Sequence, residues 1–416
     1  MGHGRFASST IITAVALCAT LTISAQSNGL RTAPSEKLTV NPGFRDWGPA
    51  TIAGTTILAG NSTNRGGLFA VDTITGKLKW SARPTGVAHG SPGVSTAPAV
   101  SGTIVLAPMG NTLVALSLAA GKELWRGPAT AVGASVAADA GTAFVLGEDS
   151  KFYALDAATG HEKWKTPFAR TSCGAVPVVR DGVVYVTGNI QVKPADAGRA
   201  ASYYLHLFAL DASTGRELWR YPSAPAGVTS GVCFTQPIVT ADAVFAVGDE
   251  TLYAVDRTTG RNRWAPVEVR RSVDGRVRPV PVFGLVDGGS VLVGITKGFL
   301  IAFDKASGRT AWEIAGQYRE SSPSTAVAGR VLYFQGHPGA PPAADVQDRI
   351  VYSGGKPVTP APALPGGRLN ALDLDTHTVL WSFSRPTAEA GWAFGFVTPV
   401  DGGLWVDSYQ ALVKLQ

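Results

Sequence analysis

The sequence predicts an all-β fold, an eight-bladed β-propeller of four-stranded antiparallel blades closed by an N-terminal strand, with seven blades as the alternative. Three observations predict this fold. One eleven-residue phrase recurs along the chain, strand and turn patterns recur around it, and the two chain ends supply complementary parts of one blade. A unit of about 45 residues is too small to bury its own apolar face, so such units must stack on one another.

The recurring phrase is Ala-x-Asp-x-x-Thr-Gly-x-x-x-Trp. Its full copies are Ala70–Trp80, Ala154–Trp164, Ala209–Trp219 and Ala254–Trp264. Looser copies are Ala115–Trp125 with Ser117 for Asp, Ala302–Trp312 with Ser307 for Thr, and Ala371–Trp381 with His377 for Gly. The intervals between successive tryptophans are 45, 39, 55, 45, 48 and 69 residues. Since the scaffold repeats, its function must lie in what departs from the repeat.

Strand patterns surround each copy. In the fourth unit, Ala175–Val179 leads through a turn to Val183–Thr187, and Leu205–Leu210 leads through the phrase to Arg216–Trp219. Alternating apolar residues in these runs are the period-two signal of strands. Four antiparallel strands per repeat form a propeller blade.

The phrase itself has a structural explanation. Its glycine adopts the left-handed conformation that closes a hairpin with a bulge, and its Asp and Thr side chains bond free backbone groups. His377 is tolerated there, because histidine adopts positive φ more readily than most residues. The tryptophan is large enough to seal the gap between neighbouring blades. We therefore expect docking, not catalysis, from Trp47, Trp80, Trp125, Trp164, Trp219, Trp264, Trp312 and Trp381.

The blade count follows from the chain ends. Phe396–Val400, Gly403–Val406 and Ala411–Leu415 supply three strands, and the chain stops where an outer strand should follow. Trp47 stands alone before the first unit. We therefore expect a strand at Val40–Trp47 to complete the last blade and remove the exposed sheet edges.

Composition and charge narrow the class of protein. The chain has 49 glycines and 27 prolines, and only 16% of its residues are charged, which suits short strands joined by tight turns. The net charge is +6, without a Lys/Arg run that would mark a nucleic-acid arm. We expect a monomer that does not bind nucleic acid.

The N-terminus resembles an export signal. Residues 1–25 contain the basic Arg5, the apolar run Ile11–Ile23 and a small-residue cleavage site at Ser24-Ala25. Residues 26–39 are predicted to be a flexible segment and 40–416 the propeller. We expect an exported protein, periplasmic or secreted and at most membrane-peripheral, with lipoprotein anchoring at Cys18 as the alternative. Export also permits a disulfide between Cys173 and Cys233, which occupy matching positions in adjacent repeats; two separate thiols are the alternative.

The phrase resembles the tryptophan-docking motif of the pyrroloquinoline-quinone (PQQ) propeller repeat family, over about residues 40–416. This superfamily includes quinoprotein alcohol dehydrogenases and BamB-like propellers of envelope assembly machinery. The resemblance to the dehydrogenases implies adjacent cysteines, a catalytic Asp and calcium ligands. The sequence has no Cys-Cys pair, and neither the acid nor the ligands map onto it. The non-enzymatic, BamB-like branch therefore fits better.

A ligand or partner is expected on one face. Two long insertions, Asn189–Tyr204 and Gln335–Arg368, follow second strands and share a face with the loops between blades. Long loops on a rigid scaffold usually carry function, with neutral decoration as the alternative. Arginines bind carboxylate or phosphate, although solvated loop charge explains them too. The candidate residues on this face are Arg83, His89, Arg170, Tyr203, Tyr204, Arg270, Arg271, Arg319, His337 and Trp392.

The predicted function is an exported, non-catalytic scaffold of the cell envelope that binds a protein, an anionic ligand or a glycan. Two enzymatic alternatives remain: a PQQ-dependent oxidoreductase with calcium, and a carbohydrate-active enzyme or glycan binder. We predict no catalytic residue, no metal ligand and no cofactor.

Overall fold

The computed structural model describes residues 29–40, 47–61, 67–83, 96–130, 135–168, 177–193, 202–222, 236–248, 250–273, 276–296, 298–318, 325–339, 352–353, 356–357, 368–384, 396–408 and 411–416. All regular structure in these ranges is β-strand. The predicted all-β class is confirmed.

The strands pair into antiparallel sheets in chain order. The first contains β2 (Trp47–Ala53), β3 (Thr56–Asn61), β4 (Leu68–Asp72) and β5 (Leu78–Ala82). The next contains β6 (Ala99–Ser101), β7 (Ile104–Met109), β8 (Thr112–Ser117) and β9 (Glu123–Ala129). It is followed by β10 (Val136–Asp139), β11 (Thr142–Leu146), β12 (Lys151–Asp156) and β13 (Glu162–Pro167). Then come β14 (Val178–Arg180), β15 (Val183–Lys193), β16 (Ser202–Asp211) and β17 (Glu217–Pro222).

The second half of the chain continues the pattern. One sheet contains β18 (Ile238–Val239), β19 (Ala243–Gly248), β20 (Thr251–Asp256) and β21 (Val267–Glu268). Then come β24 (Val282–Asp287), β25 (Val291–Thr296), β26 (Phe299–Asp304) and β27 (Thr310–Tyr318), and next β28 (Ala326–Ala328), β29 (Val331–Pro338), β32 (Leu369–Asp373) and β33 (Val379–Phe383). Pairing of β27 with β29 joins these two groups into one sheet. Two short hairpins are β22 (Arg270–Val273) with β23 (Arg276–Pro279), and β30 (Tyr352–Ser353) with β31 (Lys356–Pro357).

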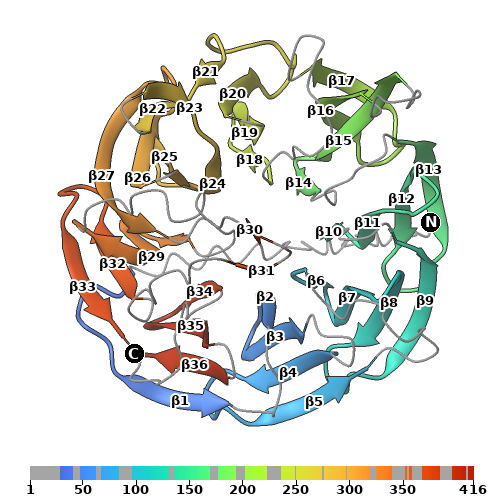
Figure 1. The fold of residues 1–416 in the computed structure, drawn as a ribbon. Helices are drawn as coiled ribbons and strands as arrows, with labels where there is room; N and C mark the ends of the chain where they lie inside the picture. Colours follow the sequence, from blue (N-terminus) through green and yellow to red (C-terminus); the bar gives the residue numbers. More distant parts are fainter. Residues whose placement is uncertain are drawn as a thin grey trace, which may run out of the picture.

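The sheets surround a common centre, as Figure 1 shows, with first strands such as β2, β6 and β10 near the centre and β5, β9 and β13 at the rim. Apolar side chains fill the layer between neighbouring sheets. Leu58 and Leu68 of one sheet, for example, cluster with Val105 and Ala107 of the next. The core is therefore a series of layers between sheets, as expected for stacked repeats.

The eleven-residue phrase forms the turn between the third and fourth strands, as predicted. In the β14–β17 sheet, Asp211 Oδ1 accepts hydrogen bonds from the backbone N–H groups of Ser213 (3.0 Å) and Thr214 (2.9 Å). Gly215 has a φ of +73°, and the strand register shifts at Ala209/Leu210. The Ser213 and Thr214 hydroxyls also donate to Asp211 Oδ1, at 2.6 and 2.9 Å, and these bonds, with the weaker effect of the backbone bonds, hold the pKa of the Asp211 side chain below its usual value.

The tryptophans dock on the next sheet. Trp219 Nε1 donates to the carbonyl of Arg257 at 3.0 Å, and the ring covers Gly260, where an added Cβ would lie 2.7 Å from the indole. Trp80, Trp125, Trp164 and Trp264 make the same pair of contacts with their neighbours. Trp264 does so although it lies just before β21, outside the strand in which the sequence placed it. In these cases, the copy of the phrase in the next sheet therefore forms a turn, and the same turn is the surface on which the tryptophan of the preceding sheet docks.

The loosest copy of the phrase departs from this docking. His377 has a φ of +58°, and its ring lies 4.8 Å from the ring of Trp312, at an interplanar angle of 35°. No described residue accepts a hydrogen bond from Trp312 Nε1. The imidazole therefore takes the place that a bare glycine has elsewhere.

The N-terminal strand pairs with the last strand, but at different residues from those predicted. The strand β1 (Glu36–Val40) pairs antiparallel with β36 (Ala411–Leu415). In the same sheet, β36 pairs with β35 (Gly403–Ser408), and β35 pairs with β34 (Val397–Val400). We call these four strands the closing sheet. Trp47 begins β2 and pairs with Asn61, so its assignment as the docking tryptophan of the closing sheet was wrong. The lone tryptophan misled because the closing strand carries none.

Leu38 occupies the docking position in the closing sheet. It faces Lys414 across the strand pair, as Trp80 faces Ala70 in the first sheet. A Cβ on Gly76 would lie 3.5 Å from the Leu38 side chain. The apolar contact that tryptophan makes elsewhere is therefore made by leucine here.

Part of the segment 26–39, which we expected to be flexible, is built into the sheets. The backbone N–H of Leu30 donates to the Tyr333 hydroxyl, and the Leu30 carbonyl accepts from Trp381 Nε1 at 2.7 Å. Arg31 forms an ion pair with Asp373, whose side chain is buried. Leu30 therefore supplies the hydrogen-bond acceptor for Trp381 that the phrase supplies at other sheet boundaries, and the flexibility of segment 26–39 stays a prediction. Cys173 and Cys233 lie outside the described residues.

Candidate functional site

At one place on the predicted loop-bearing face, the structure shows which strand ends lie together. The end of β27 pairs with the end of β29, where Gln317 faces His337, so the end of a fourth strand and the end of a second strand lie together. The described ends of the insertion at Asn189–Tyr204 continue β15 and β16, which stay paired as far as Lys193 and Ser202. These ends therefore extend the sheet.

Two described arginines among the candidates, Arg270 and Arg271, have carboxylate partners. Arg270 Nε lies 2.6 Å from Glu268 Oε2, and Arg271 Nη2 lies 2.6 Å from Glu313 Oε2. The Arg271 guanidinium also covers the Phe299 ring, 5.4 Å from its centroid. These glutamates reduce the local positive charge, which weakens the expectation of a ring of arginines for an anionic ligand.

The other predicted candidates are dispersed. Arg83 is exposed at the end of β5, and His337 is half-buried in β29. Tyr203 and Tyr204 pair through their backbones with Gln191 and Ile190. The structure does not bring these residues together into one site. The remaining candidates, His89, Arg170, Arg319 and Trp392, lie outside the described residues.

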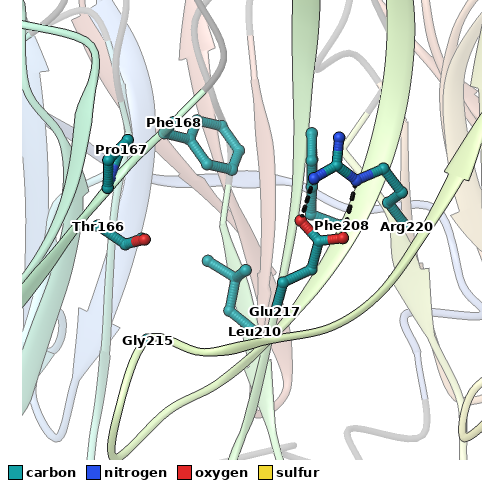
Figure 2. A pocket seen from close by; sticks show the side chains of 8 residues that line it. All are labelled: Thr166, Pro167, Phe168, Phe208, Leu210, Gly215, Glu217 and Arg220. Atoms are coloured by element: carbon teal, nitrogen blue, oxygen red, sulfur yellow. Dashed lines mark hydrogen bonds and ion pairs between the residues drawn. The ribbon is translucent and has the colours of Figure 1, made fainter.

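A groove between two neighbouring sheets is a candidate site within the described ranges, with a volume of about 280 Å³. One wall is the end of β13, and the other is formed by β16, the turn of the phrase and β17 (Figure 2). We call it the β13–β17 groove. It is lined by Thr166, Pro167, Phe168, Phe208, Leu210, Gly215, Glu217 and Arg220.

Aromatic rings form the floor of this groove. The Phe168 ring lies 4.8 Å from the buried Phe208 ring and 5.4 Å from the Phe152 ring. Phe168 is only half-buried, and its backbone N–H donates to the Ser150 carbonyl at 2.8 Å. This bond fixes the chain where it leaves β13, so the ring is held at the surface of the groove.

An ion pair borders the aromatic floor. Arg220 Nε and Nη2 donate to the two oxygens of Glu217 at 2.7 and 2.6 Å, as Figure 2 shows, and the guanidinium lies 5.3 Å from the Phe208 centroid. The bidentate pair raises the pKa of Arg220. Behind Phe208, burial and the nearby Arg220 lower the pKa of His206. The groove thus joins an apolar floor to a fixed, charge-balanced rim.

A second groove is built from the same repeat positions two sheets away. It has a volume of about 190 Å³ and lies between the end of β5 and the β6–β9 sheet. We call it the β5–β9 groove. It is lined by Ala82, Arg83, Met109, Val114, Leu116, Gly121, Glu123 and Arg126.

Sequence reasoning missed the β13–β17 groove. Its signal was present, since Phe168 follows Trp164 by four residues and Phe208 directly precedes Ala209, so both have fixed places relative to the phrase. Aligning all repeats at those positions would have shown which sheets carry large aromatic residues there.

Among the described residues, no group of three His, Cys, Asp or Glu side chains could hold a metal ion, and the sequence has no adjacent cysteines. We derive no chemical step through a quinone or its calcium ion. Within the described ranges, no helix is long and apolar enough to cross a membrane.

The sheets, their order and the docking phrase define a repeat protein of the β-propeller class. The family described as outer membrane protein assembly factor BamB matches residues 23–126, 109–200 and 191–345. The chain therefore belongs to this BamB-like family of PQQ-type propeller repeats, which is related to the quinoprotein alcohol dehydrogenases.

Solved structures support the fold. The chain is similar to BamB from Moraxella catarrhalis, with a TM-score of 0.52 and 17% identity over 73% of this chain and 97% of that one. It is also similar to the quinohemoprotein alcohol dehydrogenase from Comamonas testosteroni, with a TM-score of 0.57 and 15% identity over 92% and 76% of the two chains.

Sequence relatives point to several functions. The chain is 33% identical to the serine/threonine-protein kinase AfsK of Streptomyces coelicolor over 240 residues, which cover 56% of this chain and 27% of the kinase. It is 31% identical to the dehydrogenase subunit of the quinone alcohol dehydrogenase of Acetobacter aceti over 180 residues, 39% and 20% of the two chains. The chain thus matches only a fifth to about a quarter of these relatives' length.

Proposed function

We propose that the protein is an exported, non-catalytic interaction scaffold, an eight-bladed propeller that binds a partner protein of the cell envelope through the β13–β17 groove. The eight blades are the separate four-stranded sheets together with the two strand groups joined by β27 and β29. Membership of a family described as an assembly factor supports a scaffolding role.

The observation that carries the proposal is the half-buried Phe168 above the buried Phe208, beside the Arg220–Glu217 pair. Well-packed apolar pockets bordered by arginine are typical energetic centres of protein interfaces. A groove of about 280 Å³ admits one or two large side chains. The groove therefore suits an apolar, preferably aromatic, anchor of the partner.

Quantitative affinity purification from envelope extract tests this proposal. The wild type is compared with Phe168→Ser, which makes the floor of the groove polar. The matched control is Val277→Ser, which removes an exposed apolar side chain from the β22–β23 hairpin, where Val277 is 66% exposed. We expect one partner to be depleted several-fold by Phe168→Ser alone. Equal recovery with all three proteins would remove the groove from the proposed function.

The oxidoreductase alternative is tested with the same wild-type sample. Dye reduction that depends on added PQQ and calcium would overturn the non-catalytic proposal. We expect none above the rate without protein.

A further inference from the structure

We propose that the outer rim of the first two sheets docks on an anionic lipid bilayer. This surface consists of Ile74, Lys77 and Leu78 in the β4–β5 hairpin and of Lys122 and Leu124 in the β8–β9 hairpin, and we call it the basic rim. The inference does not depend on the proposed function, because none of these residues lines the β13–β17 groove.

Exposed apolar side chains are concentrated on these two hairpins. Among the described residues, six large apolar side chains are exposed, and three of the six are Ile74 (68%), Leu78 (49%) and Leu124 (48%). The hairpins belong to neighbouring sheets, with β5 and β9 at the rim in Figure 1. Apolar side chains gathered on one part of a surface indicate contact with a partner protein or a membrane.

The two hairpins are held next to each other in a fixed conformation. Trp80 Nε1 of β5 donates to the carbonyl of Leu118 in the β8–β9 turn at 2.8 Å, and the Trp80 ring covers Gly121 of the same turn. Asp72 Oδ1 accepts a hydrogen bond from the backbone N–H of Ile74 at 3.1 Å, which fixes the chain below this side chain. The basic rim is therefore ordered before docking, so little conformational entropy is lost on binding.

Two exposed lysines lie beside the apolar side chains. Lys77 and Lys122 each directly follow the glycine of the phrase, and neither forms an ion pair with a described residue. In the second sheet, Ser117 stands where the phrase has aspartate, so this turn lacks the carboxylate of the other copies.

The carboxylates of these hairpins already have other cationic partners. Asp72 Oδ2 lies 3.2 Å from Lys79 Nζ, and Glu123 Oε2 lies 2.7 Å from Arg126 Nη2. The two lysines that follow the phrase glycines are therefore surplus positive charge, which complements anionic lipid headgroups. Basic residues combined with exposed aliphatic side chains are typical of surfaces that bind such membranes peripherally.

The repeat does not require apolar residues at these positions. In the fifth sheet, Thr258 and Asn262 occupy the places of Ile74 and Leu78, although Arg261 keeps the basic residue after the glycine. The apolar side chains of the basic rim are therefore a local departure from the repeat and not part of its docking scheme.

Fluorescence quenching of the full chain tests the docking directly. The vesicles contain phosphatidylglycerol and phosphatidylcholine with brominated acyl chains, which quench only a fluorophore that reaches the bilayer. An environment-sensitive fluorescent amino acid replaces Ala119 in the β8–β9 turn or, as the matched control, Ala306 at the same phrase position of the sixth sheet; both alanines are exposed. We expect quenching at position 119 and none at position 306. Since both proteins keep the apolar run near the N-terminus, its own affinity for lipid does not produce this difference.

Substitutions test the chemistry with the fluorophore at position 119. Lys77→Gln combined with Lys122→Gln should raise the lipid concentration for half-maximal quenching by roughly five-fold per lysine on anionic vesicles. Ile74→Ser combined with Leu78→Ser should reduce the quenching several-fold. All four side chains are exposed, so the fold should not change.

The control for charge is Arg261→Gln combined with Arg309→Gln, which removes the corresponding basic residues of the fifth and sixth sheets and should have no effect. Equal quenching at both fluorophore positions, equal quenching by vesicles of phosphatidylcholine alone, or no response to the lysine substitutions would overturn the proposal. Absence of quenching at position 119, together with a protein from vesicle-free extract that the wild type retains and the lysine variant loses, would assign the basic rim to a protein partner and also overturn it.

Discussion

Lys414 Nζ donates to the backbone carbonyl of Thr73 at 3.0 Å, across the boundary between the closing sheet and the first sheet. Thr73 follows Asp72 in the phrase, as Leu118 follows Ser117, and the Leu118 carbonyl accepts from Trp80 Nε1. The lysine therefore supplies the hydrogen bond that an indole supplies elsewhere, and Leu38 supplies the packing. Two residues from opposite ends of the chain together replace one tryptophan.

This division of roles predicts the stability of the ring closure. Leu38→Ala should lower the free energy of unfolding by about 1–2 kcal/mol, because Leu38 is only half-buried, and Lys414→Met by about 1 kcal/mol through loss of one hydrogen bond. Urea denaturation measures both. The control is Lys37→Met, because Lys37 is exposed and lies next to Leu38 on β1. It should change the free energy of unfolding by less than about 0.5 kcal/mol. Equal stability of all variants would contradict the closure described above.

Because the tryptophan ring of the preceding sheet packs on the glycine of the phrase, a substitution of that glycine should destabilise the fold more than one at a glycine without such a contact. Gly260→Ala should destabilise the fold by at least about 2 kcal/mol, since φ is positive and the new Cβ would meet the Trp219 ring. Gly102→Ala is the matched control, because its φ of +59° is similar but nothing lies within 4 Å of its Cβ position. It should cost only the backbone strain, about 1 kcal/mol. Thermal unfolding that ranks the two equally would show that Trp219 does not confine Gly260.

His206 predicts a pH dependence of stability. Burial lowers the pKa of the folded imidazole below the ordinary 6.5, so the unfolded chain binds more protons once the pH falls below that value. The contribution of neutral His206 is fully present above pH 6.5 and is lost as the pH falls to the lowered pKa. Unfolding curves between pH 7.5 and 5 should show a steeper loss for the wild type than for His206→Gln. Parallel curves would contradict this assignment.

The repeat made the architecture predictable, because the turn, the strand pattern and the docking tryptophan all recur at fixed spacing. The errors fell where the repeat is broken. Leu38 carries no indole, so its docking role was hidden until β1 was seen beside β36. Phe168 was missed for a related reason. It forms the floor of the groove only together with Phe208, which follows forty residues later and is brought next to it by the packing of the neighbouring sheet. Ion pairing was also invisible, since Arg271 and Glu313 are distant in sequence.

Site-specific photocrosslinking in living cells tests the central claim most directly. A photoreactive phenylalanine analogue replaces Thr166, which lines the β13–β17 groove, and the control replaces Thr310, exposed on the distant strand β27. We predict one crosslinked partner from position 166 that is absent from position 310, and its loss when Phe168→Ser is added. Crosslinks of equal yield and identity from both positions, or none from position 166, would contradict an interaction scaffold that uses this groove.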